Sequence, residues 1–281
     1  DSGPFFVAKG NLSEINQSGN GNTAMVTQVE RNDDGILPLN RGSFIDQSGN
    51  DNAATVMQTG TNKSDIDQDG NGNTAMVTQT GANGSDVFQD GDDNSATVTQ
   101  TGAINISDID QLGNNNNATV TQTGQGESTI LQTGNLNGAI VTQDGLLNNS
   151  TVDQSGNVNL AVVNQNGIGN TSTVDQDASV SIANVTQNGN GNTSVVSQAS
   201  GFVHILNVAG VTQNGNNNTS TLMQDGRLNV ASVSQTGNDN MSTFSQTGTG
   251  NLSTISQTGN GHMSTLSQTG NLNTMSVTQS N

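Results

Sequence analysis

The sequence of 281 residues predicts an all-β fold, a β-solenoid of about twelve turns with two short strands per turn that forms cross-β fibrils. Three observations support this. Apolar and polar residues alternate within short segments, a Gln recurs at near-constant spacing, and the composition is too poor in large apolar side chains for a globular core. In the segment Asn73–Gly81, N-T-A-M-V-T-Q-T-G, every second residue belongs to an ordered pattern, as in a strand with two distinct faces.

The composition limits how such a chain can fold. It contains six Phe, no Tyr or Trp, and only 29% hydrophobic residues, which by itself suits a disordered chain. Stacked repeats, however, can bury a thin continuous core that no single repeat could bury alone. The strict repetition therefore favours a folded solenoid.

The repeat is defined by a Gln that occurs in 24 units, and 18 of the 23 spacings between successive Gln residues are 11 residues. The residue two before each Gln is always aliphatic or Phe. Four before the Gln, Ser occupies all twelve odd units and Ala ten of twelve even units, so one full turn spans two units. We expect a leader arm at residues 1–10, a solenoid at 11–281, and insertions near 29–40 and 199–206.

Identical units stacked in register place like side chains on one another, which suits amides because each can donate to one neighbour and accept from the other. We therefore expect inner columns of Gln and aliphatic residues, with Asn at the corners and Gly where the chain turns. The predicted core ladder contains Gln68, Gln79, Gln89, Gln100, Ile66, Val77, Val87, Val98, Asn62, Asn73, Asn83 and Asn94.

The charge excludes several partners. The net charge is −18 with only five Lys and Arg, whereas nucleic acids and anionic membranes need clustered basic residues. No apolar run approaches the roughly 18 residues of a membrane-spanning helix. The chain has no Cys, and its two His residues are isolated from any candidate nucleophile. We thus expect no enzyme activity, no cofactor and no metal; if the chain is exported, its signal has been removed.

The two ends of the solenoid are the expected functional sites. A solenoid leaves its first and last turns with unpaired backbone groups, and no atypical capping sequence is present at either end. Subunits can then add head to tail without closing, as in an open filament. The predicted assembly edges comprise Asn11, Ile15 and Gln17 at one end and Asn273, Val277 and Gln279 at the other.

The acidic residues are concentrated in the first half of the chain, with 19 of 23 at or before Asp153. Stacked carboxylates repel by about 1 kcal/mol per pair even in water. We interpret the outward column Asp65, Asp86 and Asp108 as gatekeepers that slow pairing of the early turns, so that the C-terminal turns pair first. Two alternatives are that these residues only keep the chain soluble, or that they bridge divalent cations.

With this repeat laid out, the chain resembles the curlin-repeat family, the subunits of bacterial curli fibres. The resemblance rests on Gln-x-Gly-x-x-Asn runs such as Gln68–Asn73 and Gln89–Asn94, and it covers nearly everything after residue 10. It implies a secreted functional amyloid of the biofilm matrix that contributes to cell adhesion. It also implies a nucleator subunit and an outer-membrane secretion channel as partners. In contrast to the familiar major subunit of about five repeats, both strands here begin with Asn, so major subunit and nucleator both stay open.

The principal rival is a monomeric ice-binding solenoid. The outward pairs Thr78/Thr80, Thr99/Thr101 and Thr121/Thr123 form three consecutive Thr-x-Thr rungs. The ladder then changes to Thr142/Asp144 and Asn164/Asn166, whereas an ice-matching face should persist. An adhesin or phage-fibre segment is a further alternative, but it predicts a separate receptor-binding domain that this sequence lacks.

Overall fold

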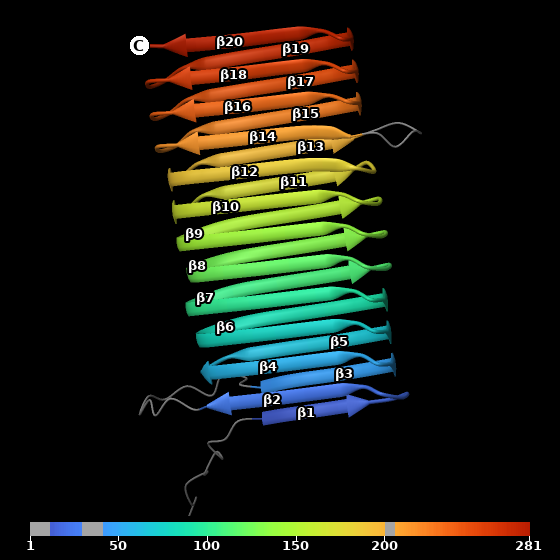
Figure 1. The fold of residues 1–281 in the computed structure, drawn as a ribbon. Helices are drawn as coiled ribbons and strands as arrows, with labels where there is room; N and C mark the ends of the chain where they lie inside the picture. The colour runs from blue at the N-terminus through green and yellow to red at the C-terminus, as the bar shows by residue number, and fades with distance from the viewer. Residues whose placement is uncertain (1–11, 30–41, 200–205) are drawn as a thin grey trace, which may run out of the picture.

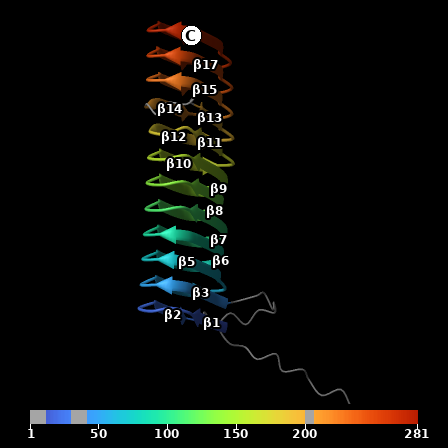
Figure 2. The same ribbon diagram turned by 90° about the vertical axis from the view of Figure 1, so that its right-hand side faces the viewer.

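The protein is a rod built from stacked parallel strands, as seen in the computed structural model, which describes residues 12–29, 42–199 and 206–281 (Figures 1 and 2). These residues contain no helix and form a parallel β-solenoid of about 11 turns. The expected count was twelve, which is the number of repeats. Twelve stacked repeats are separated by eleven intervals of one turn each, and this accounts for the difference.

Twenty strands make up the rod, and their bounds follow chain order: β1 (Leu12–Gln17), β2 (Thr23–Val29), β3 (Gly42–Asn50), β4 (Ala53–Gly60), β5 (Lys63–Asn71), β6 (Thr74–Asp92), β7 (Ser95–Leu112), β8 (Asn117–Thr133), β9 (Gly138–Ser155), β10 (Leu160–Ile168), β11 (Thr171–Asp177), β12 (Ser181–Asn190), β13 (Thr193–Ala199), β14 (Asn207–Asn214), β15 (Thr219–Arg227), β16 (Val230–Thr236), β17 (Met241–Thr249), β18 (Leu252–Thr258), β19 (Met263–Asn271) and β20 (Thr274–Ser280).

The strands pair in two series rather than with their neighbours in sequence. β1 pairs with β3 and β3 with β5, while β2 pairs with β4 and β4 with β6, always in parallel and with Gln opposite Gln. β6 to β9 are long strands that run through a corner, so each contributes its first half to one series and its second half to the other. Every repeat therefore lies on its own copy one turn away.

Inward side chains of both series fill a narrow core, and outward side chains form two opposite faces. We name the outward side chains of the first series the T face. This series consists of β2, β4, the first halves of β6 to β9, and β10, β12, β14, β16, β18 and β20. We name the outward side chains of the second series the D face. This series consists of β1, β3, β5, the second halves of β6 to β9, and β11, β13, β15, β17 and β19.

The corners depend on left-handed backbone at two positions. The Gly two residues after a Gln has a positive φ, for example 121° at Gly70, as the sequence predicts. In most corners the residue four after the Gln is left-handed as well, and here non-glycine residues occur, including the β-branched Val158 and Val180, both with φ of 61°. The sequence pattern does not predict this second position, because non-glycine residues often occupy it.

Some expectations concern residues outside the described ranges. They are the leader arm at 1–10, the edge residue Asn11, and most of the two insertions near 29–40 and 199–206.

We predict that Gly70→Ala destabilises the rod by at least about 1 kcal/mol, because the left-handed φ strains any L side chain. An added Cβ would also overlap the carbonyl oxygen of Gly91 in the next turn. The control is Gly84→Ala, where φ is not left-handed and no heavy atom lies within 4 Å of the added Cβ. Urea titration of freshly prepared monomer measures both, and equal losses of unfolding free energy would contradict this account of the corners.

Candidate functional site

Two continuous ladders of Gln carboxamides run through the core, one in each series of strands. In both, Nε2 of one Gln donates to Oε1 of the Gln one turn later, at 2.7 to 3.0 Å. One ladder joins Gln17, Gln47, Gln68, Gln89, Gln111, Gln132, Gln154, Gln176, Gln198, Gln224, Gln246 and Gln268. The other joins Gln28, Gln58, Gln79, Gln100, Gln122, Gln143, Gln165, Gln187, Gln213, Gln235, Gln257 and Gln279. Every bond has the same direction, so all donor groups of a ladder point toward the C-terminal end of the rod and all acceptor groups toward the N-terminal end.

Most of the Gln residues also connect the two series across the core. The second hydrogen of Nε2 donates to a backbone carbonyl of the opposite series, for example Gln79 to Lys63 at 3.1 Å and Gln100 to Gly84 at 3.0 Å. Between its ladder bonds and this cross bond, the buried amide is fully satisfied, which avoids a cost of about 1–3 kcal/mol for each unpaired group.

The Asn columns hold the corners through hydrogen bonds that run in both directions along the rod. Oδ1 of Asn73 accepts from the backbone N–H of Asn94 one turn later at 2.9 Å, and Nδ2 of Asn73 donates to the carbonyl oxygen of Gly91 at 2.7 Å. Asn83 bonds to Asn62 in the same manner, at 3.0 Å through its backbone N–H. All four expected Asn positions, Asn62, Asn73, Asn83 and Asn94, are buried.

Aliphatic and small residues complete the core. Ile66, Val77, Val87 and Val98 each have 0% exposure. The buried Ser column is less well satisfied, since the hydroxyls of Ser64, Ser107 and six others in the column accept or donate no hydrogen bond. Ser is therefore not required for polar bonding at most of these positions, and the Ala that replaces it in the other series fits the same small space.

At both ends the same columns are exposed. Ile15 in β1 is 42% exposed and Gln17 is exposed too, although their counterparts Ile45 and Gln47 one turn inward have 1% and 0% exposure. Val277, Gln279 and Asn273 at the other end are partly exposed. Within the described residues, β1 and β2 pair only on the side of β3 and β4, and β19 and β20 only on the side of β17 and β18.

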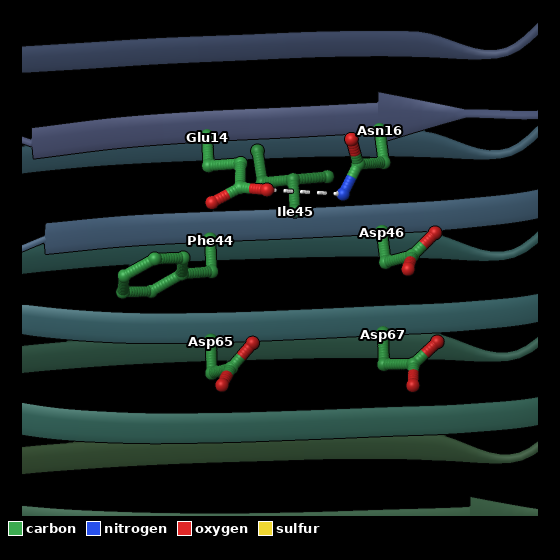
Figure 3. A pocket seen from close by; sticks show the side chains of 7 residues that line it. All are labelled: Glu14, Asn16, Phe44, Ile45, Asp46, Asp65 and Asp67. Carbon is green, nitrogen blue, oxygen red and sulfur yellow. Dashed lines mark hydrogen bonds between the residues drawn. The ribbon is translucent and has the colours of Figure 1, made fainter.

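The D face of the first turns has rows of carboxylates at the repeat spacing. Figure 3 shows Glu14, Phe44 and Asp65 stacked in one column and Asn16, Asp46 and Asp67 in the column beside it. These residues line a shallow hollow together with Ile45, and Asn16 Nδ2 donates to Glu14 at 3.5 Å. The predicted gatekeepers Asp65, Asp86 and Asp108 lie opposite one another in successive turns.

Burial, and then repulsion from neighbouring carboxylates, raises the pKa of several of these groups above the ordinary value of 3.8. The groups with a raised pKa are Asp67, Asp86, Asp108 and Asp110 in these turns and Asp153 and Asp175 further along. Folding therefore makes these residues harder to ionise than they are in the unfolded chain.

The described ranges give little support for a metal site, a membrane-spanning helix or a continuous ice-binding face. They contain no group of three or more His, Cys, Asp or Glu residues placed to hold a metal ion. Nor does any helix in them have the length and apolar character needed to cross a membrane. The Thr-x-Thr rungs from Thr78/Thr80 to Thr121/Thr123 stack on the T face, but the following turns continue it with Thr142/Asp144 and Asn164/Asn166.

We predict that Gln122→Ala lowers the free energy of unfolding by at least about 2 kcal/mol, because it leaves Gln100 Nε2 and Gln143 Oε1 without their ladder partners. Gln125→Ala is the matched control, since this corner residue of β8 is not fully buried and belongs to neither ladder. Denaturant titration compares the two, and a Gln122→Ala loss no larger than that of the control would contradict the role of the ladder.

We predict that the rod gains stability on acidification. Asp86 and Asp108 have a folded pKa above their ordinary value, so their favourable contribution is full below pH 3.8 and is lost as pH rises through the raised folded pKa. The double variant Asp86→Asn/Asp108→Asn should therefore show a smaller difference in unfolding free energy between pH 7 and pH 3.5. The corner variant Asp51→Asn/Asp239→Asn serves as the charge-matched control, and an equal reduction in both would refute the assignment.

Comparison with known families identifies the repeat. Four segments, residues 49–81, 91–124, 215–248 and 248–280, match the curlin associated repeat. Comparison with curated proteins gives no match. The curlin repeat belongs to a structural rather than an enzymatic family, in agreement with an architecture of stacked amides. The stacked Gln and Asn columns run through the four matched segments and continue in the turns between them, and the matches support a curlin-repeat family protein.

Proposed function

We propose that this chain is a structural subunit of an extracellular curli-type fibre and that it polymerises head to tail through the two ends of the rod. The observation that supports this most directly is the exposure at both ends of columns that are buried elsewhere. Ile15 and Val277 belong to the aliphatic columns, and Gln17 and Gln279 to the Gln ladders. A second subunit offers each end the same surface that the next turn offers inside the rod.

The direction of the ladders supports one orientation of addition. Because Nε2 always points toward the C-terminal end, Gln268 of one subunit would donate to Gln17 of the next, and Gln279 to Gln28. β19 would then extend the series of β1, and β20 that of β2. Such a heterologous contact does not close on itself, so it generates an open filament with a continuous cross-β stack.

The biological setting follows from the family alone. Curlin-family members are extracellular fibre subunits, which favours secretion of this chain. Roles in biofilm matrix and cell adhesion, a nucleator subunit and an outer-membrane secretion channel belong to the same proposal. A net charge of −18 with only five Lys and Arg does not favour a nucleic-acid partner, and the proposal includes no membrane insertion.

Within this proposal, the gatekeeper column sets the order of assembly. Asp65, Asp86 and Asp108 lie on successive turns near the first end, where repulsion of about 1 kcal/mol per pair opposes stacking. The same outward column has Thr221, Thr243 and Thr265 near the other end, which stack without repulsion. The C-terminal turns would accordingly order first and present β19 and β20 as the growing edge.

We predict that purified monomer forms fibres with a 4.7 to 4.8 Å reflection along the fibre axis. Val277→Lys should lengthen the lag or abolish fibre formation, because it would bury an unpaired charge at each junction between subunits. Thioflavin fluorescence follows the kinetics, and fibre diffraction verifies the spacing.

The control is Thr265→Lys, which adds the same charge at the same end but outward on the D face. It should form fibres at the rate of the unmodified chain within about threefold. A monomer that stays soluble under all conditions would refute the proposed function, and equal effects of the two substitutions would refute the end-to-end contact.

A further inference from the structure

The two faces of the rod differ in charge. The D face includes fourteen acidic residues among the described positions: Glu14, Asp46, Asp65, Asp67, Asp69, Asp86, Asp90, Asp108, Asp110, Glu127, Asp153, Asp175, Asp177 and Asp225. Among the described outward positions of the T face, Asp144 alone is charged. Most acidic residues of the described ranges therefore lie on one side of the molecule.

The T face also exposes an aliphatic row that the fold itself does not use. Leu160, Ile182, Val208, Val230 and Leu252 lie opposite one another in five successive turns, at the start of their strands. Leu160, Ile182, Val230 and Leu252 are 37% to 46% exposed. The remaining outward residues of this face are mostly Thr, Ser and Asn, and the resulting surface is almost uncharged and rich in short polar side chains.

We propose that the T face is a lateral interface that binds the T face of a second copy of this chain, so that rods associate in pairs. The contact would resemble two sheets packed face to face at about 10 Å, with short side chains of both partners interdigitating. This inference concerns the folded rod and holds whether or not its ends polymerise.

Charge favours a second copy as the occupant. Two molecules that each have a net charge of −18 repel, and a contact between D faces would oppose rows of carboxylates at close range. A contact between T faces keeps every carboxylate of those rows in solvent and desolvates only Asp144. A basic partner would instead select the D face, where the charge lies.

The available area is sufficient for such an interface. A strand of 7 residues, as in β16, is roughly 23 Å long at about 3.3 Å per residue. About 11 turns at about 4.8 Å each extend for roughly 53 Å. The T face thus offers roughly 1,200 Å² to a partner, which exceeds the about 800 Å² per partner of a standard interface.

Two matched double variants test the proposal. Thr186→Asp/Thr212→Asp places two carboxylates at stacked, half-buried positions of the T face, and Thr151→Asp/Thr173→Asp does the same on the D face. Scanning transmission electron microscopy measures the mass per length of the fibres. A single rod has one 28.7 kDa subunit per roughly 58 Å, because the contact between subunits adds a twelfth step of about 4.8 Å.

We expect the unmodified chain and the D-face variant to show twice the mass per length of a single rod, and the T-face variant to fall by a factor of two. Equal mass per length in all three would overturn the proposal.

If no fibres form, the proposed polymerisation fails, and sedimentation equilibrium of the soluble chains then tests whether the T faces pair. A dimer that only the T-face variant loses supports the pairing, and three monomers refute it. Should the T-face variant lack a β-sheet circular dichroism spectrum, Leu160→Thr/Ile182→Thr replaces it.

Discussion

Stacking of like on like is the constraint on which the rest of the rod depends. A core this thin cannot be held by apolar burial alone, and a buried amide is tolerable only when each of its donors and acceptors has a partner. The Gln ladders meet that condition because the group above and the group below are identical. Gln100, for instance, donates both to Gln122 in the next turn and to the backbone of Gly84 across the core. One substitution in a ladder therefore affects three turns.

The corners follow from the same constraint. For each Gln to meet its copy, the chain must reverse within a few residues, and a left-handed conformation two residues after the Gln achieves this. The close approach of successive turns at Gly70 and Gly91 excludes any side chain there. Four residues after the Gln the corner is more open, so Val158 is accommodated in a left-handed conformation with its side chain 48% exposed.

The outward side chains of the two faces differ in charge because the core does not depend on them. Because the core is satisfied from within, outward residues vary without loss of the fold, and the two faces have diverged. The D face keeps carboxylates such as Asp86 and Asp108, whose pKa is raised first by partial burial and then by repulsion from neighbouring carboxylates. The T face stays neutral, and it is there that two rods of the same charge can approach. End contacts would set the growth axis, and face contacts the thickness of the fibre.

The sequence alone determined the strand class, the inner columns and the repeat, because a period of two residues within a period of eleven has few packing solutions. The burial of Ile66 and Val77 follows directly from that pattern. Only the tertiary structure decided the uniform direction of the ladders, the left-handed residues such as Val180, and the missing partners of the Ser hydroxyls. These features depend on where a side chain lies relative to the next turn, and a one-dimensional pattern contains no such distances.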